Sequence, residues 1–357
     1  MNFVYPSVEL IDEKDNFKRI ERAGRTCYKS EDKATEDSAF PFFQRIVKRG
    51  HTSVLEHSVI FVRTHTPEAC MKLKQILTEY VEETGYQHYI RYSKWDDDYE
   101  IYSAKDVEYE ESDISLGVCV GKEYLFSGNI RAWRNICERF AGETLLRDIF
   151  YDHIAFKDIF TDRDIELYGV SLSVPILYGK EHVEIVDSIP TNPEEFYDAY
   201  KHNIVTLKIV GDRGVIDEYA RHRVCGISIE STRYVDYSNN GTTFVFPYWY
   251  DKLHEDPLCA SLAGNFGNRC YDTEVAYQEW MKKCKVPQMA RGNLTLWVKS
   301  EGAFTATVQQ WIDILALRDS PAAHPEAQRI AKMIEQVLVN EVGIKDIWGV
   351  KDNGLGQ

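Results

Sequence analysis

The stretch RHRVCGISIESTRY, residues 221–234, gathers side chains that could bind a phosphate or a carboxylate. It holds Arg221-His222-Arg223 and, after seven intervening residues, Ser231-Thr232-Arg233. Arginine is always charged and presents a planar fork of donors that fits both anions. The alternative is structural, because the triplet ends a predicted helix and cations at a helix C-terminus offset its dipole. Composition alone leaves both interpretations open.

The rest of the chain is acidic, so this basic cluster stands out. The 357 residues include 42 Lys and Arg against 57 Asp and Glu, a formal net charge of −15. This balance argues against a general binder of nucleic acid or anionic membranes. The eight cysteines form no CxxC pair and no Cys/His zinc spacing, which predicts reduced thiols and no metal site. We see no apolar leader and no run of membrane-spanning length, and therefore expect a cytoplasmic protein.

The elements that must position the motif follow from periodicity and stop signals. A strand over 203–210 leads through a turn into a helix over 211–223, so the triplet is expected on the last helical turn. The acidic run 95–113 is typical of a solvated excursion. Further helices are predicted over 12–30, 39–50, 67–85 and 125–140, and strands over 58–64 and 162–179.

Two segments with the same aromatic pattern indicate an internal repeat. Residues 126–140 (FSGNIRAWRNICERF) align without a gap on residues 304–318 (FTATVQQWIDILALR), 178 positions later, with Trp133 on Trp311. Shorter echoes link SVIFV to VTLKIV and IRYSKWDDDYEIY to TRYVDYSNNGTTF. Single matches of this kind arise by chance, but together they predict a duplicated chain. We place the boundary near residue 190, and the predicted halves are 1–190 and 191–357.

The order RHR, seven residues, then SxR resembles the signature of the flavin-dependent thymidylate synthases. Two more segments resemble that family: GHTSVLEH at 50–57, and the stretch 289–318, in which Arg291 is expected to open a strand and Arg318 to close the next helix. The resemblance implies an α+β fold, a mostly antiparallel sheet flanked by helices, duplicated within this chain. It also implies reductive methylation of dUMP to dTMP, with methylenetetrahydrofolate as carbon donor and FAD reduced by NADPH as hydride donor.

The resemblance assigns roles residue by residue. Arg318 would be catalytic, lying beside the uracil and favouring its ionised form; a helix-end arginine is the structural alternative. Asn129 would contact the flavin, although Asn is also a favoured helix N-cap. The expected dUMP-binding residues are Glu218, Arg221, Glu230, Ser231, Arg233, Arg291 and Arg318. The expected flavin-binding residues are Ser53, His222, Arg223, Asn129, Arg131 and Asn135.

Departures from the family pattern indicate two specialised halves. The family carries Asn-Ala-Arg and a further Asn on its C-terminal helix, where this chain has Thr307, Val308, Gln309 and Asp313. The first copy has the residue types and spacing of the family at the equivalent positions, Asn129, Arg131 and Asn135. The first copy lacks RHR and has Phe140 in the position of Arg318. We therefore expect the first half to keep flavin contacts and the second half to keep the nucleotide-binding arginines.

This division of roles also predicts an assembly. Members of the family are homotetramers with active sites shared between subunits, so we expect a homodimer of duplicated chains or a tetramer. The expected partners are the small molecules dUMP, folate and NADPH. One alternative is a non-catalytic nucleotide-binding relative of the same family. The other is a protein that binds nucleic acid through RHR, which the net charge and the lack of an interleaved aromatic and basic surface disfavour.

Overall fold

The computed structural model describes residues 1–85, 90–94, 123–160, 182–191, 193, 195–196, 198–223 and 225–344. The chain forms two compact units: the first unit is Met1–His57 with Ile204–Gln357, and the second unit is Ser58–Asn203. The division differs from the expected halves, because the first 57 residues pack with the C-terminal segment. The strand predicted over 162–179 and the acidic run 95–113 lie outside the described residues.

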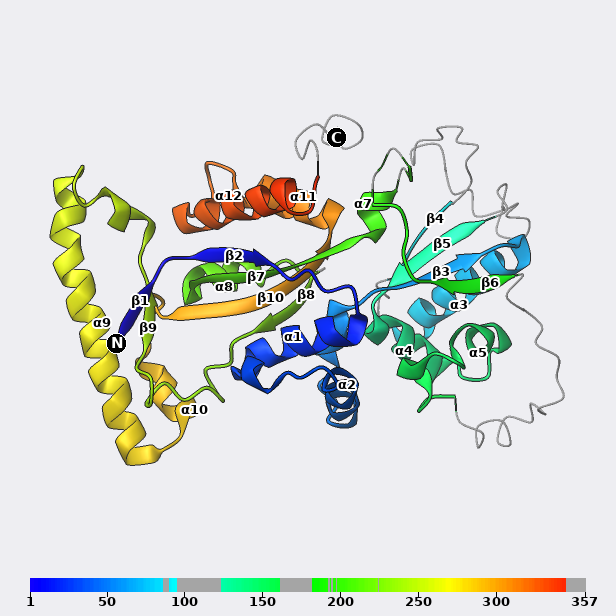
Figure 1. The fold of residues 1–357 in the computed structure, drawn as a ribbon, viewed down its shortest axis with the longest axis horizontal. Helices are drawn as coiled ribbons and strands as arrows, with labels where there is room; N and C mark the ends of the chain where they lie inside the picture. Colours follow the sequence, from blue (N-terminus) through cyan, green and yellow to red (C-terminus); the bar gives the residue numbers. More distant parts are fainter. Residues whose placement is uncertain are drawn as a thin grey trace. The chain divides into compact units, whose positions relative to one another are not determined.

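The first unit is built on a four-stranded antiparallel sheet in the order β2-β7-β10-β8 (Figure 1). Its strands are β2 (Ser7–Leu10), β7 (Ile204–Asp212), β10 (Lys299–Thr307) and β8 (Gly226–Ile229). β7 and β10 pair along nine residues each, and eight of the nine residues of β10 are buried. Because successive residues of a strand face opposite sides, both faces of β10 must be covered.

Helices cover both faces of this sheet. Figure 1 shows α1 (Asn16–Tyr28) and α2 (Ala39–Lys48) on one side and α11 (Val308–Arg318) and α12 (Pro325–Asn340) on the other. Ala303 of β10 joins Ala23 of α1 in a buried cluster, whereas the next residue, Phe304, meets the edge of the Tyr219 ring of α8 (Arg213–Tyr219). The helices predicted over 12–30 and 39–50, and a helix closed by Arg318, are confirmed.

The first unit also contains a parallel strand pair and a long helix. The pair is β1 (Asn2–Val4) with β9 (Thr243–Val245). The long helix α9 (Pro257–Cys284) begins after Asp256, whose carboxylate accepts from Leu258 N at 2.8 Å, and the short α10 (Pro287–Ala290) follows it. Phe266 of α9 and Phe244 of β9 share an apolar cluster, so the helix is fixed to the strand pair by buried aromatic surface.

The second unit repeats this plan with shorter inner strands. Its antiparallel sheet has the order β4-β5-β3-β6. The strands are β4 (Arg91–Lys94), β5 (Tyr124–Gly128), β3 (Ile60–Thr64) and β6 (Val183–Val186). The helices are α3 (Pro67–Thr84), α4 (Ile130–Arg139), α5 (Thr144–Phe150) and α7 (Ala199–His202). The predicted strand over 58–64 and helix over 67–85 are confirmed, and the segment 125–140 forms β5 followed by α4. The α+β class with antiparallel sheets flanked by helices is thus confirmed.

The two sheets share their register as well as their strand order. Leu125 of β5 and Ala303 of β10, which are 178 positions apart as the sequence alignment requires, occupy the same place in the two sheets. The residues opposite them correspond as well. The equivalent triplets across three strands are Ser93, Leu125 and Arg63 in the second unit and Ser228, Ala303 and Lys208 in the first. A common register supports the internal duplication predicted from the sequence.

A fully buried tryptophan occupies the same position in each copy. Trp133 of α4 donates its Nε1–H to Ile60 O at 3.4 Å, on the first residue of β3. Trp311 of α11 donates to Val205 O of β7 at 3.0 Å. Each ring therefore fixes the helix after one strand to the neighbouring strand. This packing explains why the two tryptophans align in sequence.

A buried histidine lies close to each point at which the chain passes from one compact unit into the other. His57 Nδ1 lies 2.7 Å from Thr305 Oγ1, and its Nε2 lies 2.9 Å from Ser228 Oγ. In the second unit, His202 Nδ1 lies 2.7 Å from Ser127 Oγ, and His202 Nε2 lies 2.9 Å from Ser93 Oγ. Each unit thus takes its histidine from one sequence half and the hydroxyl groups from the other. This reciprocal exchange is why the compact units do not coincide with the sequence halves.

Candidate functional site

The RHR triplet lies just beyond the end of a short helix. Asp212, the last residue of β7, caps α8 directly, because its carboxylate accepts from Val215 N at 2.8 Å. No separate turn precedes the helix, which ends at Tyr219. The triplet therefore begins two residues after α8, and the prediction of a place on its last turn is wrong by that margin. His222 is half-buried, and the two arginines of the triplet are exposed.

Arg318, at the C-terminal end of α11, reaches this segment. Its Nε donates to His222 Nε2 at 2.9 Å. Its Nη1 donates to Glu218 Oε2 at 2.9 Å, and its Nη2 donates to the Glu218 backbone oxygen at 2.6 Å. Three residues predicted from two separate motifs thus form one cluster. A guanidinium has five N–H groups, of which these contacts with described residues use three, so two remain to bind a ligand.

His222 is held as a neutral imidazole. A guanidinium can only donate, so His222 Nε2 must accept and carries no proton. Burial, and secondly the charge of Arg318, lower the pKa of His222 to about 4. The ring proton is therefore on Nδ1 near neutral pH, which makes that nitrogen a hydrogen-bond donor.

The strand that follows RHR lies against the segment GHTSVLEH. A Cβ added to Gly226, the first residue of β8, would lie 2.8 Å from the backbone oxygen of Glu56. Only glycine permits so close an approach of two backbones. Glu56 belongs to the 3₁₀ helix η2 (Thr52–His57), which also carries Ser53 as an exposed side chain. Two of the segments on which the family resemblance rests are therefore neighbours in the first unit.

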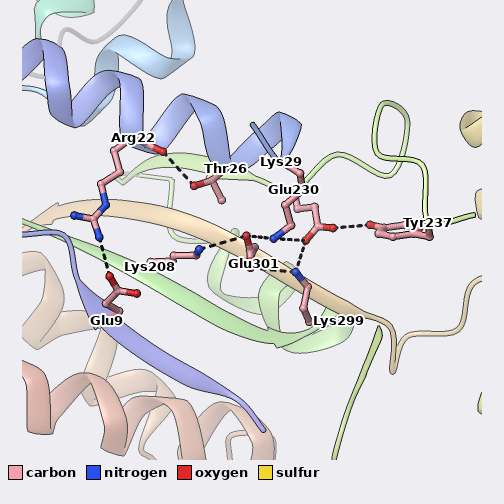
Figure 2. A network of polar contacts seen from close by, with 9 residues as sticks. All are labelled: Glu9, Arg22, Thr26, Lys29, Lys208, Glu230, Tyr237, Lys299 and Glu301. Atoms are coloured by element: carbon pink, nitrogen blue, oxygen red, sulfur yellow. Dashed lines mark hydrogen bonds and ion pairs between the residues drawn. The ribbon is translucent and has the colours of Figure 1, made fainter. Parts of the chain in front are cut away.

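Glu230 lies in a buried network of charged side chains (Figure 2). Its side chain is 1% exposed, and Lys299 Nζ lies 2.8 Å from its Oε2 in an ion pair whose angles do not make a hydrogen bond. Tyr237 Oη donates to Glu230 Oε1 at 2.7 Å. The backbone N–H of Glu230 donates to Glu301 O at 2.8 Å. The carboxylate is thus engaged by protein groups, directly before the SxR part of the signature.

Glu301 is the second carboxylate of this network, and three ammonium groups surround it. Lys299 Nζ lies 3.0 Å from Oε2 and Lys208 Nζ 3.5 Å from Oε1. Lys29 also pairs with Oε1, from a left-handed conformation (φ 49°) that ends α1. Burial alone raises the pKa of Glu301, but the charges of Lys299 and Lys29 outweigh burial and bring the pKa to about 2. The Glu301 carboxylate is therefore ionised at neutral pH, with three lysine side chains around it.

The SxR loop crosses the end of α1. Ser231 N–H donates to Cys27 O at 3.0 Å, and Ser231 Oγ accepts from Arg233 N at 3.3 Å. The Arg233 side chain is exposed, with its guanidinium carbon 5.4 Å from the centre of the Tyr234 ring. The Tyr234 ring centre lies 5.6 Å from that of Tyr28. The loop thus presents a guanidinium beside a pair of tyrosines.

Arg291 does not open a strand, so this expectation is wrong. It is the first residue of the 3₁₀ helix η6 (Arg291–Asn293), and β10 begins only at Lys299. A local turn holds Arg291 instead, because the side-chain amide of Asn293 donates to Ala290 O at 3.0 Å. Arg291 is exposed in the first unit, and no described contact joins it to Arg318 or to RHR.

The other expected flavin residues lie on α4 of the second unit. Asn129 is the N-cap of this helix, and its Oδ1 accepts from Ala132 N at 2.8 Å. Arg131 is half-buried and Asn135 is exposed, and their spacing of four places them on one helix face. The equivalent residue in the other copy, Thr307, caps α11 in the same way. The N-cap interpretation of Asn129 is therefore confirmed, and its amide nitrogen is not used by that bond.

Sequence reasoning missed the charged network. Lys299 and Glu301 alternate on β10 and so share a face, which was a local signal. Their partners are far away in the chain, since Lys29 and Glu301 are 272 positions apart. Over the described ranges, no group of three His, Cys, Asp or Glu side chains could hold a metal ion. The helices of those ranges include none that is long and apolar enough to cross a membrane.

Comparison with known proteins adds two findings. A family model described as "Thymidylate synthase complementing protein" matches residues 9–149 and 193–342. Among solved structures, the chain is similar to the UMP/dUMP methylase PolB from Streptomyces cacaoi, crystallised with 5-Br dUMP. The identity is 18%, the match covers 40% of this chain and 69% of that chain, and the TM-score is 0.34. No curated protein matches the chain.

Proposed function

Because the chain belongs to the family of thymidylate synthase complementing proteins, we propose that it is a flavin-dependent thymidylate synthase that methylates dUMP to dTMP. Methylenetetrahydrofolate would be the carbon donor, and NADPH the source of reducing equivalents. The observation that supports this proposal most is the cluster of Glu218, Arg318 and His222. Its members come from two motifs that are 96 to 100 positions apart.

Arg318 is proposed to act on the uracil of dUMP. Glu218 fixes its guanidinium through two hydrogen bonds, so two N–H groups have a set direction before substrate binds. A fixed cation beside a ring that gains negative charge lowers the energy of the transition state without reorganising at that moment. Glu218 is then a positioning residue that acts through Arg318.

The remaining nucleotide residues are proposed to hold the dUMP phosphate and sugar. Exposed arginines and a hydroxyl suit this task, because a guanidinium binds phosphate through two parallel bonds. Glu230, by contrast, acts from the buried network, where it fixes the start of the SxR loop. The proposed phosphate and sugar contacts are Arg221, Ser231, Arg233 and Arg291.

The residues proposed for FAD fit that cofactor in the chemistry of their donors. His222 offers an Nδ1–H donor, Arg223 an exposed guanidinium and Ser53 an exposed hydroxyl in the first unit. Amide and guanidinium groups suit the ring edge and the diphosphate. Asn129, Arg131 and Asn135 are the proposed flavin contacts of the second unit. When bound, FAD would supply the hydride chemistry, while these residues bind and orient it.

The test is flavin content followed by turnover. Purified protein should show flavin absorbance and form dTMP from dUMP only when methylenetetrahydrofolate and NADPH are both present. Colourless protein that does not take up FAD would contradict the proposal, and dUMP binding without flavin would favour the non-catalytic relative.

The first prediction concerns Arg318. Arg318→Ala should lower kcat/KM by about 100-fold or more, because a preorganised donor to the developing charge is lost. Arg329→Ala is a matched control, since its side chain has the same 18% exposure and also pairs with a carboxylate. Steady-state dTMP formation checks both variants. An unchanged rate in Arg318→Ala would remove the role assigned to this residue.

A further inference from the structure

A basic pocket lies between the end of α1 and α2 in the first unit. Its volume is about 350 Å³, and Arg25, Lys33, Arg45 and Arg49 are among its lining residues. No acidic residue of the described chain lines it. The protein has a formal net charge of −15, so a pocket with four cations and no lining carboxylate is a local region of positive charge on an acidic protein.

Three of these residues have no acidic partner within ion-pair distance among the described residues. Arg25 is buried and paired, because its Nε donates to Glu21 Oε1 at 2.9 Å. Within the part of the chain that the structure describes, Lys33, Arg45 and Arg49 form no ion pair. Three uncompensated cations around one cavity repel each other, and an anion placed among them would relieve this repulsion.

The shape of the pocket is fixed by an aromatic side chain. Phe42 is 7% exposed, and its ring centre lies 5.3 Å from the guanidinium carbon of Arg25 and 5.9 Å from that of Arg45. Arg45 and Arg49 are four residues apart at the end of α2, so both face the same side of the helix. The two side chains therefore lie on one wall of the cavity.

The pocket adjoins the nucleotide motif. Tyr28 lines it, and the Tyr28 ring centre lies 5.6 Å from that of Tyr234. The Tyr234 ring is in turn 5.4 Å from the guanidinium carbon of Arg233. Tyr28 Oη also lies 3.3 Å from His51 Nδ1 in GHTSVLEH. Tyr28 thus connects the lining of the pocket to both motifs of the first unit.

We propose that this pocket is a subsite for a multiply charged anion, the phosphate groups or the carboxylate chain of a co-substrate whose other end lies at the nucleotide motif. The proposal rests on the proposed function, because that function requires co-substrates with such groups. Arginine forks bind phosphate and carboxylate alike, so the two sources share one chemistry. The pocket would then select co-substrates by the number of their negative charges.

The experiment is calorimetric titration of the full chain with two probes, inorganic pyrophosphate and tri-glutamate. Arg45→Gln with Arg49→Gln should weaken binding of at least one probe by about tenfold or more, since two charge-assisted contacts are lost. Lys48→Gln is the matched control, because Lys48 is an exposed cation on the same helix that does not line the pocket. Loss for pyrophosphate alone supports a phosphate source, and loss for tri-glutamate alone supports a carboxylate source.

Two results would overturn the inference. One is that neither probe binds to the wild-type chain. The other is that the double variant binds both probes as the Lys48→Gln control does. Titration with dUMP is run in parallel and separates this inference from the proposed function. Wild-type protein that binds pyrophosphate but not dUMP contradicts the function alone, whereas protein that binds dUMP but neither probe contradicts the pocket alone.

Discussion

At the residue scale, the site depends on a proton that His222 does not carry. Arg318 donates to His222 Nε2, and a protonated ring would place two donors face to face. Burial is the main reason why the pKa of the His222 ring is lowered, and the charge of Arg318 is the second reason. Arg318 thus helps to keep the His222 ring neutral, and the unprotonated Nε2 of His222 in turn accepts a hydrogen bond from the Arg318 guanidinium. Sequence alone showed both residues but not that they touch.

The second prediction is that His222 stays neutral in mild acid. Its pKa is about 4 in the folded protein against an ordinary value of 6.5, so the unfolded chain takes up this proton first. Stability therefore falls as the pH drops from 6.5 towards 4, and no loss from this group occurs above 6.5. NMR titration of the ring, assigned with His222→Gln, should show a neutral imidazole at pH 5. A ring that titrates near 6.5 would contradict the Arg318 contact.

At the element scale, the SxR loop is held by the strand behind it. Lys299 on β10 bridges Glu230 and Glu301, with its Nζ 2.8 and 3.0 Å from their carboxylates. Both carboxylates are buried, so they require cations close by. The ion pairs connect the loop that carries Ser231 to β10, one of the two inner strands of the sheet. Figure 2 shows how the lysines converge on the two glutamates.

The third prediction is that Lys299→Met destabilises the first unit by about 3 kcal/mol, because two buried carboxylates lose their shared cation. The same change should raise KM for dUMP more than it lowers kcat, since the loop proposed to hold the nucleotide becomes mobile. Arg22→Gln is the control: its pair with Glu9 is 45% and 60% exposed and contributes less than about 1 kcal/mol. Denaturant unfolding and steady-state kinetics measure both effects. Equal stability of the two variants would contradict the anchoring role.

The fourth prediction uses the duplicated histidines as controls for each other. His57→Ala and His202→Ala should each cost about 2 kcal/mol or more, because each removes two hydrogen bonds to buried hydroxyl groups. Burial lowers the pKa of His57 to about 3 and that of His202 to about 4. Below pH 6.5 the unfolded chain binds these protons before the folded chain does, so the stability of the wild-type protein decreases as the pH is lowered. Each variant lacks one of the two histidines and should therefore show a weaker dependence of stability on pH. Unfolding at pH 5 and pH 7 checks this; identical slopes in all three proteins would contradict it.

At the scale of the whole molecule, local sequence patterns predicted the helices and strands. They did not predict that each compact unit combines segments from both halves of the sequence. The helices over 39–50 and 67–85 were visible from apolar spacing, and the repeat was visible because Trp133 and Trp311 fill the same buried position. The exchange of segments was not visible, since His57 and Thr305 are 248 positions apart. No spacing rule connects residues at that distance. The boundary predicted near residue 190 followed the repeat, whereas the compact units follow the packing.

The two units have complementary sets of proposed site residues. Arg318 ends α11 of the first unit, whereas Phe140 follows α4 at the equivalent place in the second. Conversely, Asn129 caps α4 where Thr307 caps α11. Each chain thus carries one set of the proposed nucleotide residues and one set of the proposed flavin residues on α4. We therefore expect one chain to take the place of two single-copy subunits.

The fifth prediction is that the active protein is a homodimer. The family resemblance implies a tetramer of single copies, and two duplicated chains would supply four copies. Light scattering after size exclusion should therefore give twice the chain mass of 41.4 kDa. Dilution below the dissociation constant should remove dTMP formation and release flavin together, because shared sites are lost when the subunits part. A monomer that keeps full activity and bound flavin on dilution would show that one chain builds its site alone.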